Sequence, residues 1–139
     1  MPFVLDACAI IAFLRGEPGA AIVRLLLLDE DCMAHAVNLC EVHYDSLLRG
    51  ENELVARGFI ADIESLGLVF REDMDSHFWQ EAGLCKSRIR RASLQISLAD
   101  CFAISLAKRA GATLVTSDRH EFEPIIENGL CPCQVKFIR

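Results

Sequence analysis

The stretch MPFVLDACAIIAFL, residues 1–14, contains a single charged side chain, that of Asp6. Its apolar run Phe3 to Leu5 is typical of a short buried strand, and Cys8 to Leu14 is expected to be a helix. Acids are seldom buried among apolar neighbours unless they are paired, hydrogen-bonded or bound to a metal ion. The stretch therefore predicts a buried strand that leads into a helix, with an acid at the junction that needs a partner.

Three further acids lie in similarly apolar surroundings. Asp100 is the only charge in LQISLADCFAISLA, residues 94–107, while Glu41 lies in AVNLCEV and Asp118 closes the run ATLVTSD. None of these segments contains Lys or Arg. Four such acids without basic partners indicate a divalent-metal site and, with it, metal-dependent chemistry on phosphate.

The chain as a whole alternates short apolar runs with helical segments. We expect strands at residues 3–5, 32–35, 68–70, 113–116 and 135–138, and helices at residues 8–14, 17–28, 38–48, 51–66, 75–91 and 97–110. This alternation predicts an α/β domain with a mainly parallel central sheet. In such sheets, ligands bind beyond the carboxyl ends of the strands, at a topological switch point.

The four acids are expected to meet at that edge of the sheet. Asp6 and Asp118 directly follow strands, and Glu41 and Asp100 fall in the first turns of helices that should start at the same edge. Four acids far apart in the sequence can thus converge on one crevice.

Three of the acids also have an ordinary structural alternative. Asp100 follows Ser97 in the capping pattern S-x-x-D, and Glu41 lies three residues after Asn38. Asp118 suits the start of a turn. Capping accounts less well for Asp6, because a cap does not require so apolar a flank.

Clustered carboxylates favour a hard cation. Mg²⁺ and Mn²⁺ take oxygen ligands, and crowded carboxylates without a cation repel one another, which raises their pKa values. A bound ion can activate water as a nucleophile, and a second ion can stabilise the leaving oxygen. Such a site needs neither His nor Lys as the nucleophile.

With these motifs in order, the chain resembles the PIN domain family, specifically the VapC-like toxins of type II toxin–antitoxin pairs. The resemblance rests on four segments spread over nearly the whole chain: VLDACAIIAFLRGEPGA, AVNLCEV, ISLADCFAISLAKRAGATLVTSD and HEFEPI. It implies a Rossmann-like α/β/α sandwich and an endoribonuclease that hydrolyses RNA with Mg²⁺ or Mn²⁺, leaving a 5′-phosphate. It also implies a homodimer that is silenced by a cognate antitoxin.

By position, the resemblance assigns the metal and catalytic roles to four acids and one hydroxyl. The acids are Asp6, Glu41, Asp100 and Asp118, and the hydroxyl is that of Thr116 in the pattern T-x-D, which would support a neighbouring carboxylate or the reacting water. A β-branched strand residue is the alternative role for Thr116.

Other polar residues near these positions have weaker assignments. Glu121 matches a further acid of the family, where Asp is more usual, but we expect it to be an exposed turn acid. Asn38 either orients Glu41 or caps its helix. Asp45, one turn beyond Glu41, is expected on a solvated helix face.

Basic residues are few near the acids. The densest cluster is CKSRIRR, which contains Lys86 and Arg88. It is either a solvated helix end or a rim that contacts phosphates. Arg15 and Arg119 flank two of the acids. These four residues are the candidates for contact with RNA.

Length and composition predict one globular domain over residues 1–139, since the hydrophobic fraction is 53%. The net charge of −6 argues against broad phosphate neutralisation as the way of holding nucleic acid. Bound cations, however, would reverse the local sign at an acidic crevice.

The sequence also predicts a cytoplasmic protein without a membrane segment. No apolar run reaches the ~18 residues of a membrane span, and the first residues lack the basic part of an export signal. Seven cysteines, an odd number, favour reduced thiols over a disulfide framework. Cys131-Pro132-Cys133 looks like half a zinc site, but only His120 and Cys101 are at hand to complete it, so no zinc site is expected.

Two alternatives to a nuclease remain. A receiver-type signalling domain also has an acidic Mg²⁺ pocket, but it needs a Lys after its fifth strand, and TLVTSD ends in Asp. A PIN-like domain without catalysis would act as a binding module, and the presence of all four acids argues against it.

Overall fold

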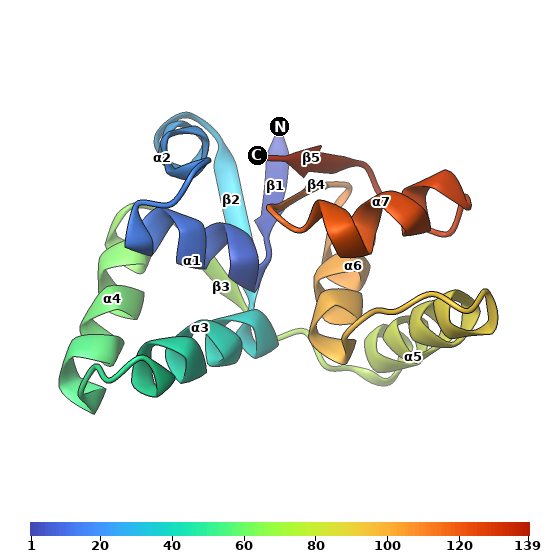
Figure 1. The fold of residues 1–139 in the computed structure, drawn as a ribbon, viewed down its shortest axis with the longest axis horizontal. Helices are drawn as coiled ribbons and strands as arrows, with labels where there is room; N and C mark the ends of the chain where they lie inside the picture. Colours follow the sequence, from blue (N-terminus) through green and yellow to red (C-terminus); the bar gives the residue numbers. More distant parts are fainter.

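A five-stranded parallel sheet forms the centre of the computed structural model, which describes residues 1–139 (Figure 1). The strands are β1 (Pro2–Leu5), β2 (Asp31–His35), β3 (Val69–Arg71), β4 (Thr113–Thr116) and β5 (Val135–Phe137). Their order is β3-β2-β1-β4-β5, and every neighbouring pair is parallel.

Seven helices connect the strands. They are α1 (Ala7–Arg15), α2 (Ala20–Asp29), α3 (Ala36–Leu48), α4 (Glu53–Ser65), α5 (Ser76–Arg91), α6 (Leu98–Ala110) and α7 (Arg119–Glu127). None of them is both long and apolar enough to cross a membrane.

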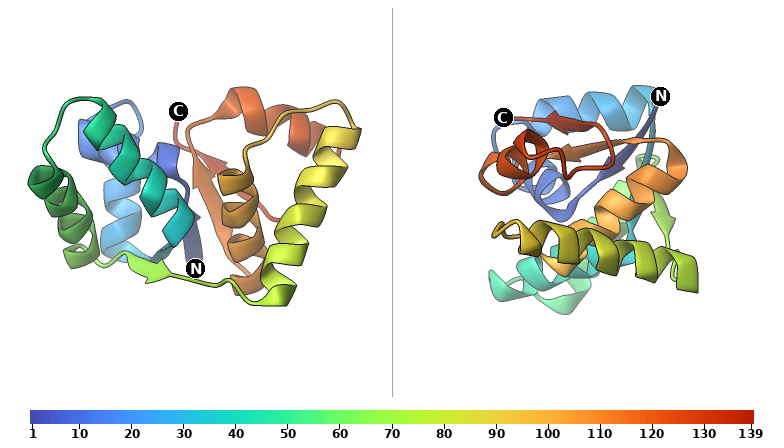
Figure 2. Two further views of the ribbon diagram at one scale, coloured as in Figure 1. Left: turned by 90° about the horizontal axis from the view of Figure 1, so that it is seen from below. Right: turned by 90° about the vertical axis from the view of Figure 1, so that its right-hand side faces the viewer.

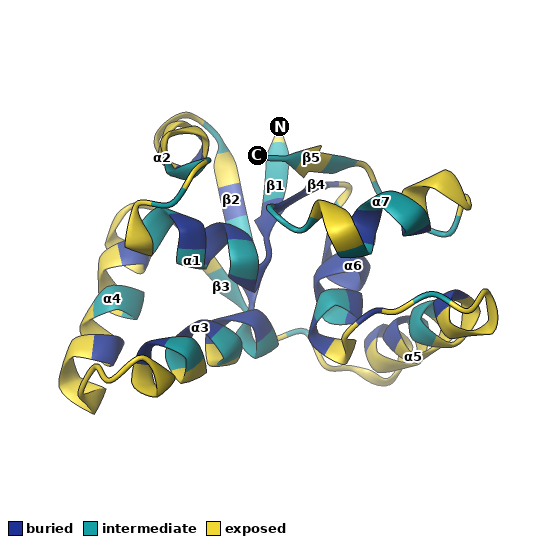
Figure 3. Cartoon of the chain, viewed as in Figure 1, coloured by how far each residue is buried: buried dark blue, intermediate teal, exposed yellow.

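The sheet has a hydrophobic core on each face, because successive strand residues point to opposite sides. Leu5 and Val115 pack with α1, α2, α3 and α4, whereas Val4 and Leu114 pack with α5, α6 and α7. Figures 1 and 2 show the two groups of helices flanking the strands. Buried residues gather on the central strands and on the helix faces that meet them, and the outer faces are exposed (Figure 3). The predicted α/β fold with a parallel sheet is confirmed.

The strand order places the topological switch point between β1 and β4. From β1 the chain adds β2 and β3 on one side, and it then returns to add β4 and β5 on the other. The connection after β1 runs to one face of the sheet and the connection after β4 runs to the other, so a crevice forms between the carboxyl ends of these two strands. Parallel sheets bind ligands in such crevices.

His35, at the end of β2, is a structural histidine. Its Nδ1 accepts a hydrogen bond from the Val37 amide at 3.1 Å, so Nε2 carries the proton and donates to the Asp73 carbonyl at 2.8 Å. The ring is buried and stacks on Phe78 and Phe102. It thereby caps α3 and joins β2 to α5 and α6.

The sequence predictions for the strands and for six helices are confirmed to within a few residues, and three details were wrong. No helix was expected where α7 lies. Pro18 precedes α2 instead of opening it, because Gly19 is the N-cap. α3 begins at Ala36, so Glu41 lies in its second turn and not in its first.

Gly19 and Gly50 provide a matched test of packing at the start of α2. Both have φ near +97°, but a Cβ at Gly19 would lie 2.7 Å from the Ile138 carbonyl oxygen, whereas a Cβ at Gly50 meets nothing within 4 Å. Both Gly→Ala changes cost the left-handed strain of about 1–2 kcal/mol. Gly19→Ala should cost about 1–3 kcal/mol more, because Ile138 has to move. Urea unfolding of the two variants measures the difference, and equal losses would contradict this account.

Candidate functional site

Asp6 lies at the carboxyl end of β1 and is the N-cap of α1. Its Oδ1 accepts a hydrogen bond from the Ala9 amide at 2.9 Å. Its Oδ2 is buried and has no hydrogen-bond partner. Capping therefore accounts for one carboxylate oxygen only, and a buried polar atom without a partner indicates a missing ligand or a functional role.

Asp118 lies at the corresponding place after β4. It is the N-cap of α7, and its Oδ1 accepts from the Glu121 amide at 2.9 Å. Its own amide donates to Thr116 Oγ1 at 3.1 Å. The fully buried Thr116 thus orients the turn that carries Asp118, and its hydroxyl also lies beside Asp6 and lowers the pKa of that acid.

Asp100 lies in the first turn of α6, as predicted. Ser97 is the N-cap, and its Oγ accepts from the Asp100 amide at 3.1 Å. In a complete capping box the Asp100 carboxylate would bond back to the Ser97 amide. Instead, that amide donates to Glu121 Oε1 at 3.0 Å. The Ser97 amide is consequently satisfied by Glu121 of α7 and not by Asp100.

Glu121 was wrongly expected to be an exposed turn acid. It is half-buried in the first turn of α7, where its carboxylate bonds to the start of α6 and raises the pKa values of Asp100 and Glu41. The missed α7 explains the error, because only this helix turns Glu121 toward α6. The pair Asp118 and Glu121, three residues apart before an apolar stretch, was a usable N-terminal signal.

Asn38 has a different role from both that were expected. His35 caps α3, and Asn38 is fully buried inside its first turn. Its Oδ1 accepts from the Ala7 amide and its Nδ2 donates to the Ala99 carbonyl, each at 3.3 Å. Asn38 therefore links the starts of α1 and α6, which carry Asp6 and Asp100.

The acids influence one another electrostatically. Burial raises the pKa of Asp6 from 3.8 to about 7, and the charges of Asp118 and Glu41 add to this effect. Burial raises the pKa of Asp100 to about 8, with further contributions from Asp6 and Glu121. Crowded carboxylates at a dry sheet edge behave in this way when no cation offsets their repulsion. The four acids are thus near enough to Asp6 or to Glu121 to affect pKa values in the group.

The cluster fits a divalent cation by its chemistry. It offers only carboxylate oxygens, the ligands that Mg²⁺ and Mn²⁺ prefer, and Asp6 Oδ2 is an unsatisfied acceptor. No group of three or more His, Cys, Asp or Glu side chains is close enough to hold an ion as the side chains stand. A shared ion would require the carboxylates to draw closer.

The four basic residues considered for RNA contact lie in different environments. Arg15 is 4.0 Å from Asp45, and Lys86 donates to the Ile96 carbonyl at 2.8 Å. Arg119 donates to the carbonyl of Arg139 at 2.7 Å and pairs with Glu123. Arg88 lines a hollow together with Lys108, at the end of α6 opposite Asp100. The structure does not bring these residues together as a rim beside the acids. Asp45 pairs with Arg49 at 3.0 Å, away from the cluster.

Residues 3–125 match the family model of the PIN domain. A search of curated protein sequences found no match. Among solved structures, VapBC2 from Rickettsia felis, bound to a DNA fragment from its promoter, is similar with a TM-score of 0.76 at 19% identity, covering 99% of this chain and 98% of that one. VapBC-1 from nontypeable Haemophilus influenzae gives 0.70 at 19% identity, with coverage of 99% and 98%.

A third similar structure carries a description of activity. VapC20 from Mycobacterium tuberculosis, described as a toxin that cleaves the sarcin–ricin loop, has a TM-score of 0.67 at 13% identity, covering 88% of this chain and 94% of that one. At such identities the likeness is one of fold. It agrees with the parallel sheet of this chain.

The raised pKa of Asp6 predicts how stability depends on pH in the absence of metal. In the unfolded chain Asp6 loses its proton near pH 3.8, whereas in the folded protein it keeps the proton up to about pH 7. The folded state binds more protons in between, so the free energy of unfolding should fall as the pH rises, by at most about 1.4 kcal/mol per unit for one group. Urea unfolding in EDTA between about pH 5 and pH 7 measures this slope.

Asp6→Asn is the matched control, because it keeps the side chain's shape and removes its titration. The slope should become shallower in this variant, and its stability at pH 7 should equal or exceed that of the wild type. An unchanged slope would mean that Asp6 is ionised throughout the window.

Proposed function

The chain belongs to the PIN domain family, and from that premise we propose that it is a metal-dependent endoribonuclease, the toxin of a toxin–antitoxin pair. The observation that carries the proposal is the buried Asp6 carboxylate, whose Oδ2 has no partner at the switch point of the sheet. A protein that needed Asp6 only as a helix cap would not bury its second oxygen unsatisfied.

We propose Mg²⁺ or Mn²⁺ as the cofactor, held by Asp6, Glu41, Asp100 and Asp118. When bound, the ion would supply a nucleophile from water at neutral pH and offset the charge that develops on the phosphate. The raised pKa values of Asp6 and Asp100, caused mainly by burial and in part by neighbouring acids, support this assignment, since a bound cation favours the charged form of both carboxylates.

The chain's own residues prepare the place for a phosphodiester. α1, α6 and α7 begin at Asp6, Ser97 and Asp118. The positive ends of their dipoles favour negative charge there, both on the carboxylates and on a phosphate. Asn38 keeps the starts of α1 and α6 together, and Thr116 orients Asp118 through its amide.

An RNA substrate and an antitoxin partner are supported by analogy. The structure of VapC20 is described as that of a toxin cleaving the sarcin–ricin loop, and those from Rickettsia felis and Haemophilus influenzae are described as VapBC. Exposed apolar side chains on the outer faces of α2, α3 and α4 offer surface for an antitoxin or a second copy in a homodimer. They include Leu25, Leu28, Leu48 and Leu54.

The proposal also includes a single domain and a location in the cytoplasm. Residues 3–125 cover most of the chain, which supports one domain over residues 1–139. All seven cysteines are free, which supports a reducing compartment such as the cytoplasm, where the RNA substrate would be.

The direct test is cleavage of total cellular RNA by the purified protein, free of antitoxin. Mg²⁺ or Mn²⁺ should give discrete fragments and EDTA should abolish them. Asp6→Asn and Asp100→Asn should each lower the rate by about a hundredfold or more, because the ion's charge stabilisation amounts to several kcal/mol. Sequencing of the fragment ends identifies the target.

Asp45→Asn is the matched control for these variants. Asp45 is also a half-buried acid, on the helix that carries Glu41, but its partners are Arg49 and Arg15. Its replacement should leave the rate within about twofold, since partly exposed ion pairs contribute little. Cleavage that persists in Asp6→Asn would instead trace the activity to a contaminating nuclease, and a wild type without cleavage would favour a binding module.

Glu121 and Glu123 allow a second comparison within α7. Glu121 faces Asp100 and Glu41, whereas Glu123 pairs with Arg119 on the outside. Glu121→Gln keeps an acceptor for the Ser97 amide but removes a charge from the cluster. It should reduce metal-dependent cleavage by about tenfold or more, as loss of a supporting residue of a metal site does. Glu123→Gln should have no such effect, and equal rates for the two variants would remove Glu121 from the site.

A further inference from the structure

Two cysteines face each other in the segment between α7 and β5. Cys131 and Cys133 flank Pro132, and their Sγ atoms are 3.8 Å apart. Both side chains are half-buried. To form a disulfide, whose S–S distance is about 2.05 Å, the two sulfur atoms have to approach each other by about 1.8 Å.

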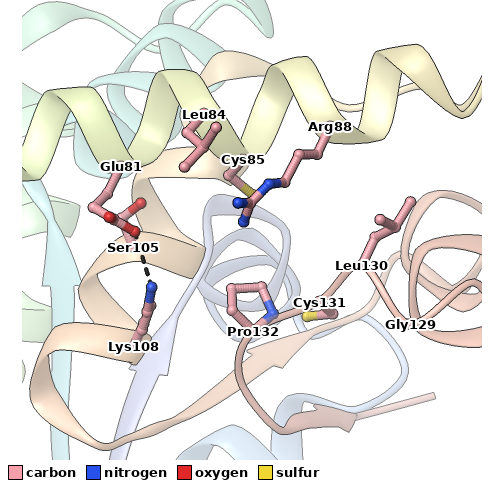
Figure 4. A pocket seen from close by; sticks show the side chains of 10 residues that line it. All are labelled: Glu81, Leu84, Cys85, Arg88, Ser105, Lys108, Gly129, Leu130, Cys131 and Pro132. Carbon is pink, nitrogen blue, oxygen red and sulfur yellow. Dashed lines mark hydrogen bonds and ion pairs between the residues drawn. The ribbon is translucent and has the colours of Figure 1, made fainter.

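Cys131 also lines a hollow of about 210 Å³ that is open to solvent. Figure 4 shows Cys131 and Pro132 on one wall and Cys85 of α5 on the other, with the Arg88 guanidinium reaching into the space between them. Lys108 lines the same hollow. A small reagent can therefore reach Cys131. Of the two basic side chains that line the hollow, Lys108 is paired at 2.9 Å with Glu81, which lines the hollow too.

We propose that Cys131 and Cys133 are a redox-active dithiol, which a low-molecular-weight disulfide oxidises to an intramolecular disulfide. This site lies at the amino-terminal edge of the sheet, where β5 begins, and is separate from the acids at the opposite edge. The proposal is therefore independent of the nuclease function. Disulfides of this transient kind are the ones that occur in reducing compartments.

The reaction proceeds in two exchanges that conserve electrons. The Cys131 thiolate attacks one sulfur of the reagent, forms a mixed disulfide and releases one reagent thiolate. Cys133 then loses its proton and attacks Cys131 Sγ, which breaks the mixed disulfide and releases the second thiolate. The protein loses two protons and two electrons, and the reagent disulfide takes them up to become two thiols.

The environment makes Cys131 the attacking residue. The contact with Cys133 lowers the pKa of Cys131 from 9.0 to about 7, against the opposing effect of burial. The same contact raises the pKa of Cys133, and either thiol can be the donor in it. A lowered pKa favours the thiolate, which is the attacking species, and Cys131 is also the member of the pair that lines the open hollow.

Cys85 is the competing partner for Cys131, because it lines the same hollow. Its thiol, however, is engaged by Cys101 of α6, whose side chain is fully buried. Cys85 and Cys101 are held on two packed helices, whereas Cys131 and Cys133 lie in one short segment without helix or strand. A disulfide between Cys131 and Cys133 therefore requires less rearrangement of the backbone than one that involves Cys85.

Oxidised glutathione is the probe that tests this proposal. The full-length protein is treated at pH 7, unreacted thiols are blocked with a maleimide, and the protein is digested with trypsin without reduction. Cleavage after Arg119 and Lys136 releases residues 120–136, which contain both cysteines. This peptide should lack both maleimides and should be lighter than its reduced form by two hydrogen atoms.

Three variants separate the proposal from ordinary thiol reactivity. Cys133→Ser should stop at a stable glutathione adduct on Cys131, and Cys131→Ser should form no disulfide. Cys40→Ser removes an exposed, isolated thiol and should leave the result unchanged. Formation of the wild-type disulfide should become faster as the pH rises through the neutral range, because the thiolate of Cys131 is the attacking species.

Two results would overturn the proposal. A wild-type peptide 120–136 with both cysteines labelled by maleimide would show that the pair does not react. A disulfide that joins this peptide to residues 72–86, which contain Cys85, would assign the partner to α5.

Discussion

The Asp6 carboxylate is buried at the carboxyl end of β1 with one oxygen unsatisfied, and the arrangement of the site depends on this constraint. A carboxylate in such a place is costly in its charged form, as its raised pKa shows. It is held there by the fold, because the apolar residues on both sides of Asp6 supply the two hydrophobic cores. The stability of the sheet therefore maintains a local arrangement that destabilises the metal-free protein.

Glu121 and Asn38 hold the start of α6 in place of Asp100. The Ser97 amide would ordinarily be bonded by Asp100, but Glu121 from the next helix bonds to it. The starts of α1 and α6 are joined by Asn38, while Asp6 caps α1 with one of its two oxygens. As a result, the second oxygen of Asp6 remains for a ligand, and Asp100 does not have to bond to the Ser97 amide. Substitution of Asn38 would disturb both helices at once, because each loses its bond to the same side chain.

Much of the fold could be predicted from the sequence, because its strands are short apolar runs and its helices end at clear signals such as Gly111. The convergence of Asp6 and Asp118 followed from the rule that parallel strands end at one edge. The helix α7 was missed because its apolar residues are few, and Pro124 within it argues against a helix. The contact of Glu121 with the start of α6 depended on that helix. The role of Asn38 was out of reach, since its partners are 31 and 61 residues away in the chain.

The basic residues of the chain are largely engaged in the fold itself. Arg109 bonds to Asp75 and Asp73 and lies over the Phe78 ring. Arg119 ties α7 to the C-terminal residue and lies over the Phe137 ring. With a net charge of −6, few cations are left to neutralise phosphates, so a surface of Lys and Arg cannot be the main source of RNA affinity. Under the proposed function, binding of RNA at this edge of the sheet would depend on cations held by the acids and on the backbone amides of the helix starts. Metal affinity and RNA affinity would then be linked, since the same ion that relieves the carboxylates also attracts the phosphate.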